Sequence, residues 1–231
     1  MSNGSDCQGV RTSASTQAIT GGGFLIGIID YGVGNLASIR NMLKRIGVES
    51  VVSGDRSVLQ EADGLILPGV GAFDTGITNL RKSGLWDFLN ERVLADHTPI
   101  LGICLGVQLL TEGSDEGQQP GLGWIRGRTV AFDRDRLQPE DKIPNMGWRD
   151  ITIVRPNPLC EELPPEPRFY CVHSFHLQCS APEDVILTCR HGYKITVGVQ
   201  RANVWGVQFH PEKSHKFGMK LLENFAKEKR S

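Results

Sequence analysis

Apolar runs of strand length alternate with helix-patterned segments in the first half of this 231-residue chain, and this alternation limits the possible folds more than any other feature. The apolar runs are residues 24–30, 49–53, 65–67 and 99–103. Between them, apolar residues recur three or four positions apart, which is typical of amphipathic helices. Strands separated by helices predict an α/β fold with an open, mostly parallel central sheet and helices on both faces. Ligands of such sheets bind beyond the carboxyl ends of the strands.

The first helical stripe has clear start and stop signals, with Asn35 as a candidate N-cap and Gly47 after its end. After Gly113 the pattern changes to short β-rich segments, so the C-terminal half is predicted to be β-rich before a last helix. The β-rich segments are residues 128–132, 150–154, 169–173, 185–189 and 204–209, and the last helix carries Leu221, Leu222 and Phe225.

Charge and composition exclude several classes of protein. The chain has 25 Lys and Arg against 26 Asp and Glu, a net charge of −1, so bulk electrostatics favour neither nucleic acid nor an anionic membrane as a partner. The longest near-apolar run, residues 99–110, is 12 residues long, whereas a membrane span needs ~20. Six cysteines stand at positions 7, 104, 160, 171, 179 and 189 without a C-x-x-C pair, which predicts free thiols in a reducing cytoplasm.

The first 23 residues have neither a basic start nor an apolar stretch, so they do not have the pattern of a secretory signal. They are rich in Ser, Thr, Gly and Gln and end in three glycines. We expect a disordered tail or an expression remnant over residues 1–23 and one domain over residues 24–231.

A cysteine at the end of the fourth apolar run is the first residue whose surroundings indicate chemistry. The segment Gly102-Ile103-Cys104-Leu105-Gly106 joins a predicted strand to a helix that begins near Leu105, as in a nucleophile elbow with Cys in place of Ser. Flanking glycines lack the Cβ atoms that would clash in such a tight turn, and the helix N-terminus favours a thiolate. The alternative is a buried structural cysteine in a glycine-rich turn.

A histidine and a glutamate follow the last predicted strand. Residues two apart in an extended stretch project to the same side, so Glu212 can lie beside the His210 imidazole. A Cys–His–acid triad needs this relation of base to orienting carboxylate. An incidental His and Glu in a surface loop are the alternative, but together with the cysteine elbow the pair favours a cysteine hydrolase-type site.

Nucleophilic attack on a carbonyl also needs donors for the developing oxyanion. The amide of Leu105 follows the nucleophile and is one candidate. The loop Pro68-Gly69-Val70-Gly71 follows an earlier strand, and an amide of Val70 or Gly71 is expected at the same edge of the sheet. An ordinary glycine-rich turn is the alternative for this loop.

These motifs resemble class I, triad-type glutamine amidotransferases over residues 24–227. The P-G-V-G loop, G-I-C-L-G-V-Q at 102–108 and F-H-P-E at 209–212 match that family in order and spacing. D-Y-G-V-G-N at 30–35, N-M-G-W at 145–148 and V-H-S-F at 172–175 are similar to the glutaminase subunit of imidazole glycerol phosphate synthase. The D-Y-G-x-G-N and M-G-W pieces are the more specific ones, because F-H-P-E fits any triad glutaminase.

The resemblance implies that Cys104 attacks the side-chain amide of L-glutamine, that His210 protonates the departing ammonia and that Glu212 orients His210. It implies ammonia transfer to a separate synthase subunit in a heterodimer, without a cofactor or a metal. The implied substrate contacts are Gly71, Gln108, Glu116, Tyr170, Ser174 and Phe175, and Asn35, Trp148 and Arg149 are expected at the partner interface.

Two positions depart from the family pattern. Arg149 stands where the family usually has Asn, and Asn145 stands where it often has His. The segment from His215 to Met219 is more similar to a sister group of glutaminases that is thought to supply ammonia for acetamidino sugars in bacterial surface polysaccharides. Histidine biosynthesis is the expected pathway, and acetamidino-sugar synthesis is the alternative.

Two interpretations from other classes remain. Residues 32–37 fit G-x-G-x-x-A with Asp55 placed as a ribose-binding acid, as in a dinucleotide-binding module, but this leaves Cys104 and His210 unexplained. Cys171, His173, His176 and Cys179 are possible zinc ligands. Strand alternation over 169–175 would place His176 on the face opposite to Cys171 and His173, so a structural role is expected for these four.

Overall fold

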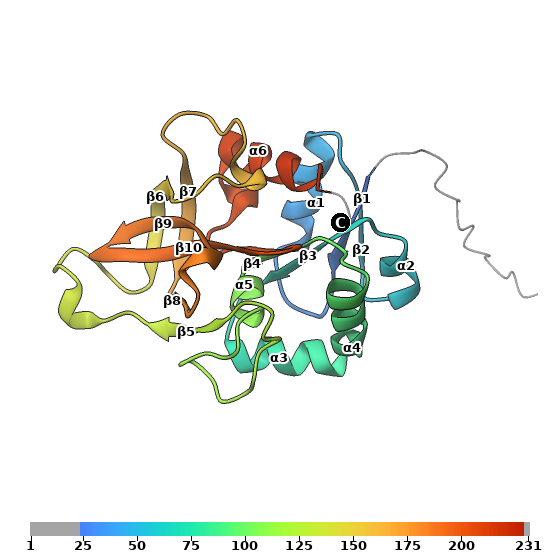
Figure 1. Cartoon of the computed structure of the whole chain (residues 1–231), viewed down its shortest axis with the longest axis horizontal. Coiled ribbons are helices and arrows are strands. Elements are labelled where there is room, and N and C mark those ends of the chain that lie inside the picture. Colours follow the sequence, from blue (N-terminus) through green and yellow to red (C-terminus); the bar gives the residue numbers. More distant parts are fainter. Residues whose placement is uncertain (1–23, 229–231) are drawn as a thin grey trace, which may run out of the picture.

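Eleven strands form an open sheet in the computed structural model of the chain, which describes residues 24–228 (Figure 1). Five strands are parallel and lie in the order β2–β1–β3–β4–β11. β3 and β4 are buried along their whole length, as expected for a parallel sheet covered on both faces. The five strands span Leu25–Ile29 (β1), Glu49–Ser53 (β2), Gly64–Gly69 (β3), Ile100–Cys104 (β4) and Val204–Val207 (β11).

Six strands continue the sheet on the far side of β11 with antiparallel pairing. The predicted β-rich C-terminal half is therefore confirmed, although β8 and β10 were not predicted and β6 begins five residues before the expected start at Asp150. The strands span Gly127–Ala131 (β5), Asn145–Ile153 (β6), Arg168–His173 (β7), Phe175–Cys179 (β8), Val185–His191 (β9) and Tyr193–Arg201 (β10).

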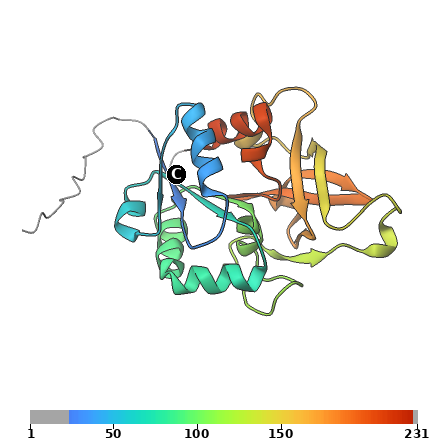
Figure 2. The same cartoon turned by 180° about the vertical axis from the view of Figure 1, so that it is seen from behind.

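Helices cover both faces of the parallel strands, as Figures 1 and 2 show from opposite sides. α1 (Leu36–Arg45) and α6 (His215–Phe225) lie on one face, and α3 (Phe73–Lys82), α4 (Leu85–Asn90) and α5 (Leu105–Leu109) lie on the other. The sequence did not predict α2 (Arg56–Gln60). Short turns of 3-10 helix span Arg134–Arg136, Pro158–Cys160, Pro182–Asp184 and Pro211–Lys213, and a π-helical turn spans Glu91–Ala95.

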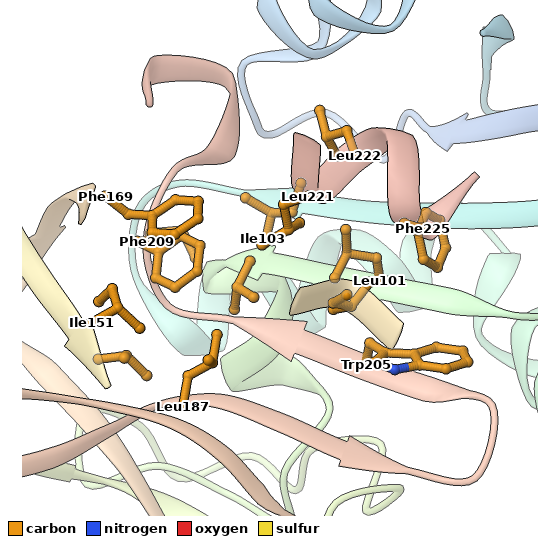
Figure 3. Close-up of a cluster of buried hydrophobic side chains, with 14 of the residues drawn as sticks. Leu101, Ile103, Ile151, Phe169, Leu187, Trp205, Phe209, Leu221, Leu222 and Phe225 are labelled. Atoms are coloured by element: carbon orange, nitrogen blue, oxygen red, sulfur yellow. The ribbon is translucent and has the colours of Figure 1, made fainter. Parts of the chain in front are cut away.

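Two apolar cores hold the sheet between these helix layers. In the first core, helix α6 contributes Leu221 and Leu222 against the sheet, and the rings of Phe169 and Phe209 stack with centroids 4.0 Å apart (Figure 3). In the second core, α3 packs against α5 through residues such as Ile77. The carboxyl ends of β3, β4 and β11 are therefore held between two packed layers, which gives any side chain at their ends a defined position.

Several local expectations can be compared with the structure. Asn35 occupies the predicted N-cap position of α1, although its side chain makes no capping hydrogen bond. Gly47 follows the helix with φ +76°, the left-handed conformation that ends helices. Five cysteines are free thiols, as predicted, whereas Cys7 and the expected tail over 1–23 lie outside the described residues. Between residues 24 and 228, no helix is long and apolar enough to cross a membrane.

Candidate active site

Cys104 lies in a strained turn between β4 and α5. Its φ of +54° and ψ of −112° are sparsely populated by residues that carry a Cβ. A Cβ on Gly106 would lie 1.8 Å from the Leu67 carbonyl oxygen, and one on Gly102 would lie 2.8 Å from the backbone nitrogen of Val107. The two glycines therefore allow the tight turn, and this geometry is that of the predicted nucleophile elbow.

His210 and Glu212 form a buried pair just after β11. His210 Nδ1 lies 2.8 Å from Glu212 Oε1, and the two side chains are 2% and 1% exposed. Burial lowers the pKa of His210, but interactions with the Cys104 thiol and the Glu212 carboxylate outweigh burial and raise the pKa to about 9. The imidazolium form is therefore favoured at neutral pH, as a general acid requires.

Two hydrogen bonds join strand β7 to the loop that carries this pair, and a third lies within the loop. His210 N donates to the Tyr170 carbonyl at 2.9 Å, and Tyr170 N donates to Ser214 Oγ at 3.0 Å. Ser214 Oγ donates in turn to the His210 carbonyl at 2.6 Å. His210 Nε2 is buried and has no hydrogen-bond partner in the part of the chain that the structure describes, so it remains available to exchange a proton.

A cavity of about 330 Å³ opens beside Cys104 and receives most of the predicted site residues. Tyr170 is the exception among the expected substrate contacts, because its ring lies edge-on to Trp148, with centroids 6.3 Å apart, and does not line the cavity. Sequence reasoning did not assign Pro144, Val172, His173 and Lys213 to the cavity wall. The predicted residues that line it are Val70, Gly71, Cys104, Leu105, Gln108, Glu116, Ser174, Phe175 and His210.

The glycine-rich loop after β3 lies directly beside the nucleophile. Gly69 pairs with Cys104 across β3 and β4, and a Cβ on Gly69 would lie 2.8 Å from Leu105 Cβ. Tyr31 Oη donates to the Pro68 carbonyl at 2.7 Å and holds the start of the loop. Val70, Gly71 and Leu105 are therefore brought to one wall of the cavity, and their role as oxyanion donors stays a prediction.

A second glutamine beside the nucleophile was missed by sequence reasoning. Gln208 is fully buried, and its Nε2 lies 3.9 Å from Cys104 Sγ. Its Oε1 accepts a hydrogen bond from Gln108 Nε2 at 3.1 Å, so Gln208 orients the side chain expected to contact substrate. A polar residue inside an otherwise apolar strand end was the available signal.

Glu116 accepts from the Phe73 amide at 2.9 Å and so connects the cavity to the start of α3.

The three residues expected at a partner interface lie on two elements. Asn35 is the N-cap of α1 and follows Gly34, which is close to Pro68, since a Cβ on Gly34 would lie 3.2 Å from Pro68 Cβ. Trp148 in β6 stacks on His215, with ring centroids 5.6 Å apart and planes 7° apart. Arg149 Nε donates to Asn145 Oδ1 at 2.7 Å. A partner contact by any of the three stays a prediction.

The structure gives the residues of the two other interpretations local structural roles. The Asp55 carboxylate accepts from the Ser57 amide at 2.8 Å and caps α2. His173 and His176 both pack against the Phe132 ring, with centroids 5.6 and 5.1 Å away. The expected alternation over 169–175 fails because the strand ends at His173 and a new one begins at Phe175. Within residues 24–228, no group of three or more His, Cys, Asp or Glu side chains is arranged to hold a metal ion.

Comparison with known proteins agrees with this geometry. The family Glutamine amidotransferase class-I matches residues 27–229. The chain is 49% identical to imidazole glycerol phosphate synthase subunit HisH 2 of Pseudomonas aeruginosa, over 87% of this chain and 98% of that protein. It is 48% identical to the protein of the same name from Methanococcus maripaludis, over 88% of this chain and 100% of that protein.

Among solved structures, PurLQS from Thermotoga maritima is similar in fold, with a TM-score of 0.68 over 88% of this chain and 97% of that one at 18% identity. The fold, the Cys104 elbow and the His210–Glu212 pair thus agree with the sequence comparisons. The chain belongs to the class I glutamine amidotransferases, enzymes with a Cys–His–Glu triad, and within them to the HisH proteins.

Proposed function

We propose that this chain is the glutaminase subunit of an imidazole glycerol phosphate synthase in histidine biosynthesis. It hydrolyses L-glutamine to glutamate and ammonia and passes the ammonia to a separate cyclase subunit. The observation that carries the proposal is the cavity where the Cys104 thiol meets the His210–Glu212 pair, in a chain 49% identical to a protein named as a subunit of that synthase. We also propose that residues 24–231 form one functional domain and that the protein is located in the cytoplasm.

The first half of the reaction forms a thioester. In line with the raised pKa of His210, the thiol proton already lies on His210 Nε2 when the Cys104 sulfur attacks the side-chain amide carbon of glutamine. The carbonyl oxygen becomes an oxyanion, which the amides of Leu105 and of Val70 or Gly71 stabilise. The C–N bond then breaks as His210 returns the proton to nitrogen, so ammonia leaves and the acyl group remains on sulfur.

The second half of the reaction hydrolyses this thioester. Water attacks the thioester carbon while His210 accepts a proton, and the same amides stabilise the second oxyanion. The C–S bond breaks, the sulfur regains its proton from His210, and glutamate leaves. Glu212 stabilises the imidazolium in both halves because its oxygen lies 2.8 Å from Nδ1. One glutamine and one water give one glutamate and one ammonia, so no oxidant or reductant is needed.

Under this proposal, the ammonia that is released in this cavity is used by a second subunit. Two segments beside the cavity support a docking face there. The loop before α1, with Asn35, packs near Pro68, and Pro144 at the cavity wall leads into the segment 145–149. Met146 in that segment is 56% exposed, and an exposed apolar side chain of this kind is typical of a surface that a partner protein covers. We propose that the cyclase binds at residues 30–35 and 145–149.

Transfer of labelled nitrogen tests the proposal. The chain is mixed with the cyclase subunit of imidazole glycerol phosphate synthase, or with an amidotransferase that makes acetamidino sugars, and is given glutamine labelled with ¹⁵N in the side-chain amide. We expect label in the imidazole product only. Label in the sugar product only would contradict the pathway and leave the glutaminase mechanism in place. No glutamate with either partner would contradict the glutaminase function itself.

A further inference from the structure

Three side chains form a hydrogen-bonded relay from strand β6 to the wall of the cavity. Arg149 Nε donates to Asn145 Oδ1 at 2.7 Å. Asn145 Nδ2 lies 3.0 Å from His173 Nε2, and His173 Nδ1 lies 2.7 Å from the Phe175 carbonyl oxygen. Asn145 and His173 face each other across the β6–β7 pair and are both buried. The relay therefore runs from a half-buried guanidinium to the segment that carries Ser174 and Phe175.

The proton positions along this relay follow from the two groups at its ends, the Arg149 guanidinium, which can only donate, and the Phe175 carbonyl, which can only accept. An arginine can only donate, so the Asn145 oxygen must face Arg149 and the Asn145 nitrogen must face His173. An amide nitrogen also only donates, so His173 Nε2 must be unprotonated. The ring proton of the neutral imidazole then lies on Nδ1 and is donated to the Phe175 carbonyl. With the amide of Asn145 reversed, two donors would face each other at Arg149.

The surroundings of His173 and of Arg149 favour one fixed arrangement of the hydrogen bonds in this relay. Burial, against the opposing effect of the hydrogen bond to the Phe175 carbonyl, lowers the pKa of His173 to about 3, and the nearby imidazoles of His176, His191 and His210 act in the same direction as burial. The ring is therefore neutral. At the other end, Arg149 also donates to the Trp148 carbonyl at 3.1 Å. Gly147, two residues before Arg149, has φ +119°, a backbone conformation that favours glycine.

We propose that Arg149 is a positioning residue for the glutamine pocket: by orienting the Asn145 amide it holds His173 as the Nδ1–H tautomer, which anchors the Phe175 carbonyl. The anchored segment, residues 172–175, forms one wall of the cavity, and the Val172 carbonyl oxygen lies 4.0 Å from Cys104 Sγ. Arg149 thus affects substrate binding through this cavity wall and not through the surface that carries Trp148. The effect on glutamine rests on the function proposed above, whereas the tautomer of His173 does not.

The tautomer is measured by nitrogen NMR of the full chain labelled with ¹⁵N-histidine, with His173→Gln to assign the signal. We expect a protonated Nδ1 and an unprotonated Nε2. An Nε2–H tautomer or an imidazolium at neutral pH in the unmodified chain would overturn the proposal without any further variant.

Three variants then test the effect on the pocket. Arg149→Met removes the donors, and Arg149→Lys keeps a donor-only group. Arg168→Met is the matched control, because Arg168 lies on the neighbouring strand β7 and forms an ion pair with the exposed Asp150. In Arg149→Met we expect mixed His173 tautomers and a KM for glutamine raised roughly 3- to 10-fold, the effect of one lost hydrogen bond, with kcat within about twofold. Arg149→Lys should restore the tautomer and most of the KM.

An unchanged tautomer and KM in Arg149→Met would overturn the proposal, as would an equal rise of KM in the Arg168→Met control. If Arg149→Met does not fold, the His173 tautomer is measured in Arg149→Lys and in the unmodified chain. Both should have the Nδ1–H tautomer, and its absence in either would overturn the proposal. If the unmodified chain hydrolyses no glutamine, the proposed function fails, and the relay is judged on the tautomers alone.

Discussion

Only the release of ammonia requires the Cys104 sulfur, whereas the use of ammonia by a partner does not. Cys104→Ala should therefore lower glutamine-dependent product formation at least roughly 10³-fold. Product formation from added ammonium salts, by the same chain with its cyclase partner, should stay within about twofold. The control is Cys179→Ala, which removes a half-buried thiol away from the cavity. Glutamate release by Cys104→Ala at the unmodified rate would contradict the assigned nucleophile.

The protonated state of His210 depends on a neighbouring carboxylate, and this gives a prediction for pH. Interactions with Cys104 and Glu212 raise the pKa of His210 to about 9 against the opposing effect of burial, so the imidazolium persists through neutral pH and is lost above about 9. Glu212→Gln removes the opposite charge, so the His210 pKa should fall by at least about one unit. The alkaline limb of kcat/KM, and an NMR titration of His210, should move to lower pH by the same amount. If the alkaline limb of kcat/KM does not move, Glu212 does not control the protonation of His210.

Residues with local signals were predictable from the sequence, and residues that depend on strand pairing were not. Cys104 between glycines and the His210-x-Glu212 spacing are short-range patterns whose geometry follows from the chain itself. Gln208 reaches Cys104 only because β11 pairs with β4, which brings Gly206 opposite Gly102. Arg149 likewise reaches His173 only through the β6–β7 pairing, so its sequence position alone suggested an outward role.

At the scale of elements, the approach of α5 to β3 limits which residues can follow the nucleophile. A Cβ on Gly106 would lie 1.8 Å from the Leu67 carbonyl oxygen, so α5 would have to move away from the sheet. Gly106→Ala should lower the free energy of unfolding by about 3 kcal/mol or more, measured by urea denaturation. Gly113→Ala is the matched control, because a Cβ there meets nothing within 4 Å, and it should change stability by less than about 0.5 kcal/mol. Equal stability of the two variants would contradict this account of the elbow.

The elements missed from the sequence have weak or interrupted strand patterns. β10 contains Gly198, and its register with β9 shifts on both sides of that residue. A bulge of this kind breaks the period of two on which a strand prediction depends. β8 follows β7 after Ser174 alone, so no turn residues separate the two strands. The buried parallel strands β3 and β4 were predictable because every residue in them is buried, so that their sequences are nearly continuous apolar runs.

At the scale of the whole molecule, the N-terminal segment is predicted to be dispensable. Residues 1–22 contain only Met1, Val10 and Ile19 as large apolar residues, so they have little apolar surface to set against the entropy of ordering. Deleting them should leave the melting temperature within about 2 °C and the glutaminase rate unchanged. A larger drop in the melting temperature would show that the segment contributes to the fold.

The last prediction separates glutamine hydrolysis from ammonia transfer. Trp148 stacks on His215 and does not line the cavity beside Cys104. It is half-buried next to the exposed Met146, on the face where we propose that the cyclase docks. A large aromatic side chain in such a place is a typical hot spot, and its loss costs about 2 kcal/mol of partner binding, or roughly 30-fold in affinity. Trp148→Ala should therefore keep hydrolysis within about twofold while less of the ammonia reaches the product.

The measurement is the ratio of imidazole product to glutamate at a fixed, subsaturating concentration of cyclase, compared with binding of the two chains by calorimetry. Trp86→Ala is the control, since Trp86 is also half-buried but lies on α4, where it contacts Arg81. A lowered ratio in Trp148→Ala that recovers at saturating cyclase would assign the effect to docking, because mass action then restores the complex. A ratio that stays low in the fully formed complex would place Trp148 on the ammonia path itself. An unchanged ratio in both variants would contradict docking through residues 145–149, and the partner would have to bind elsewhere on the molecule.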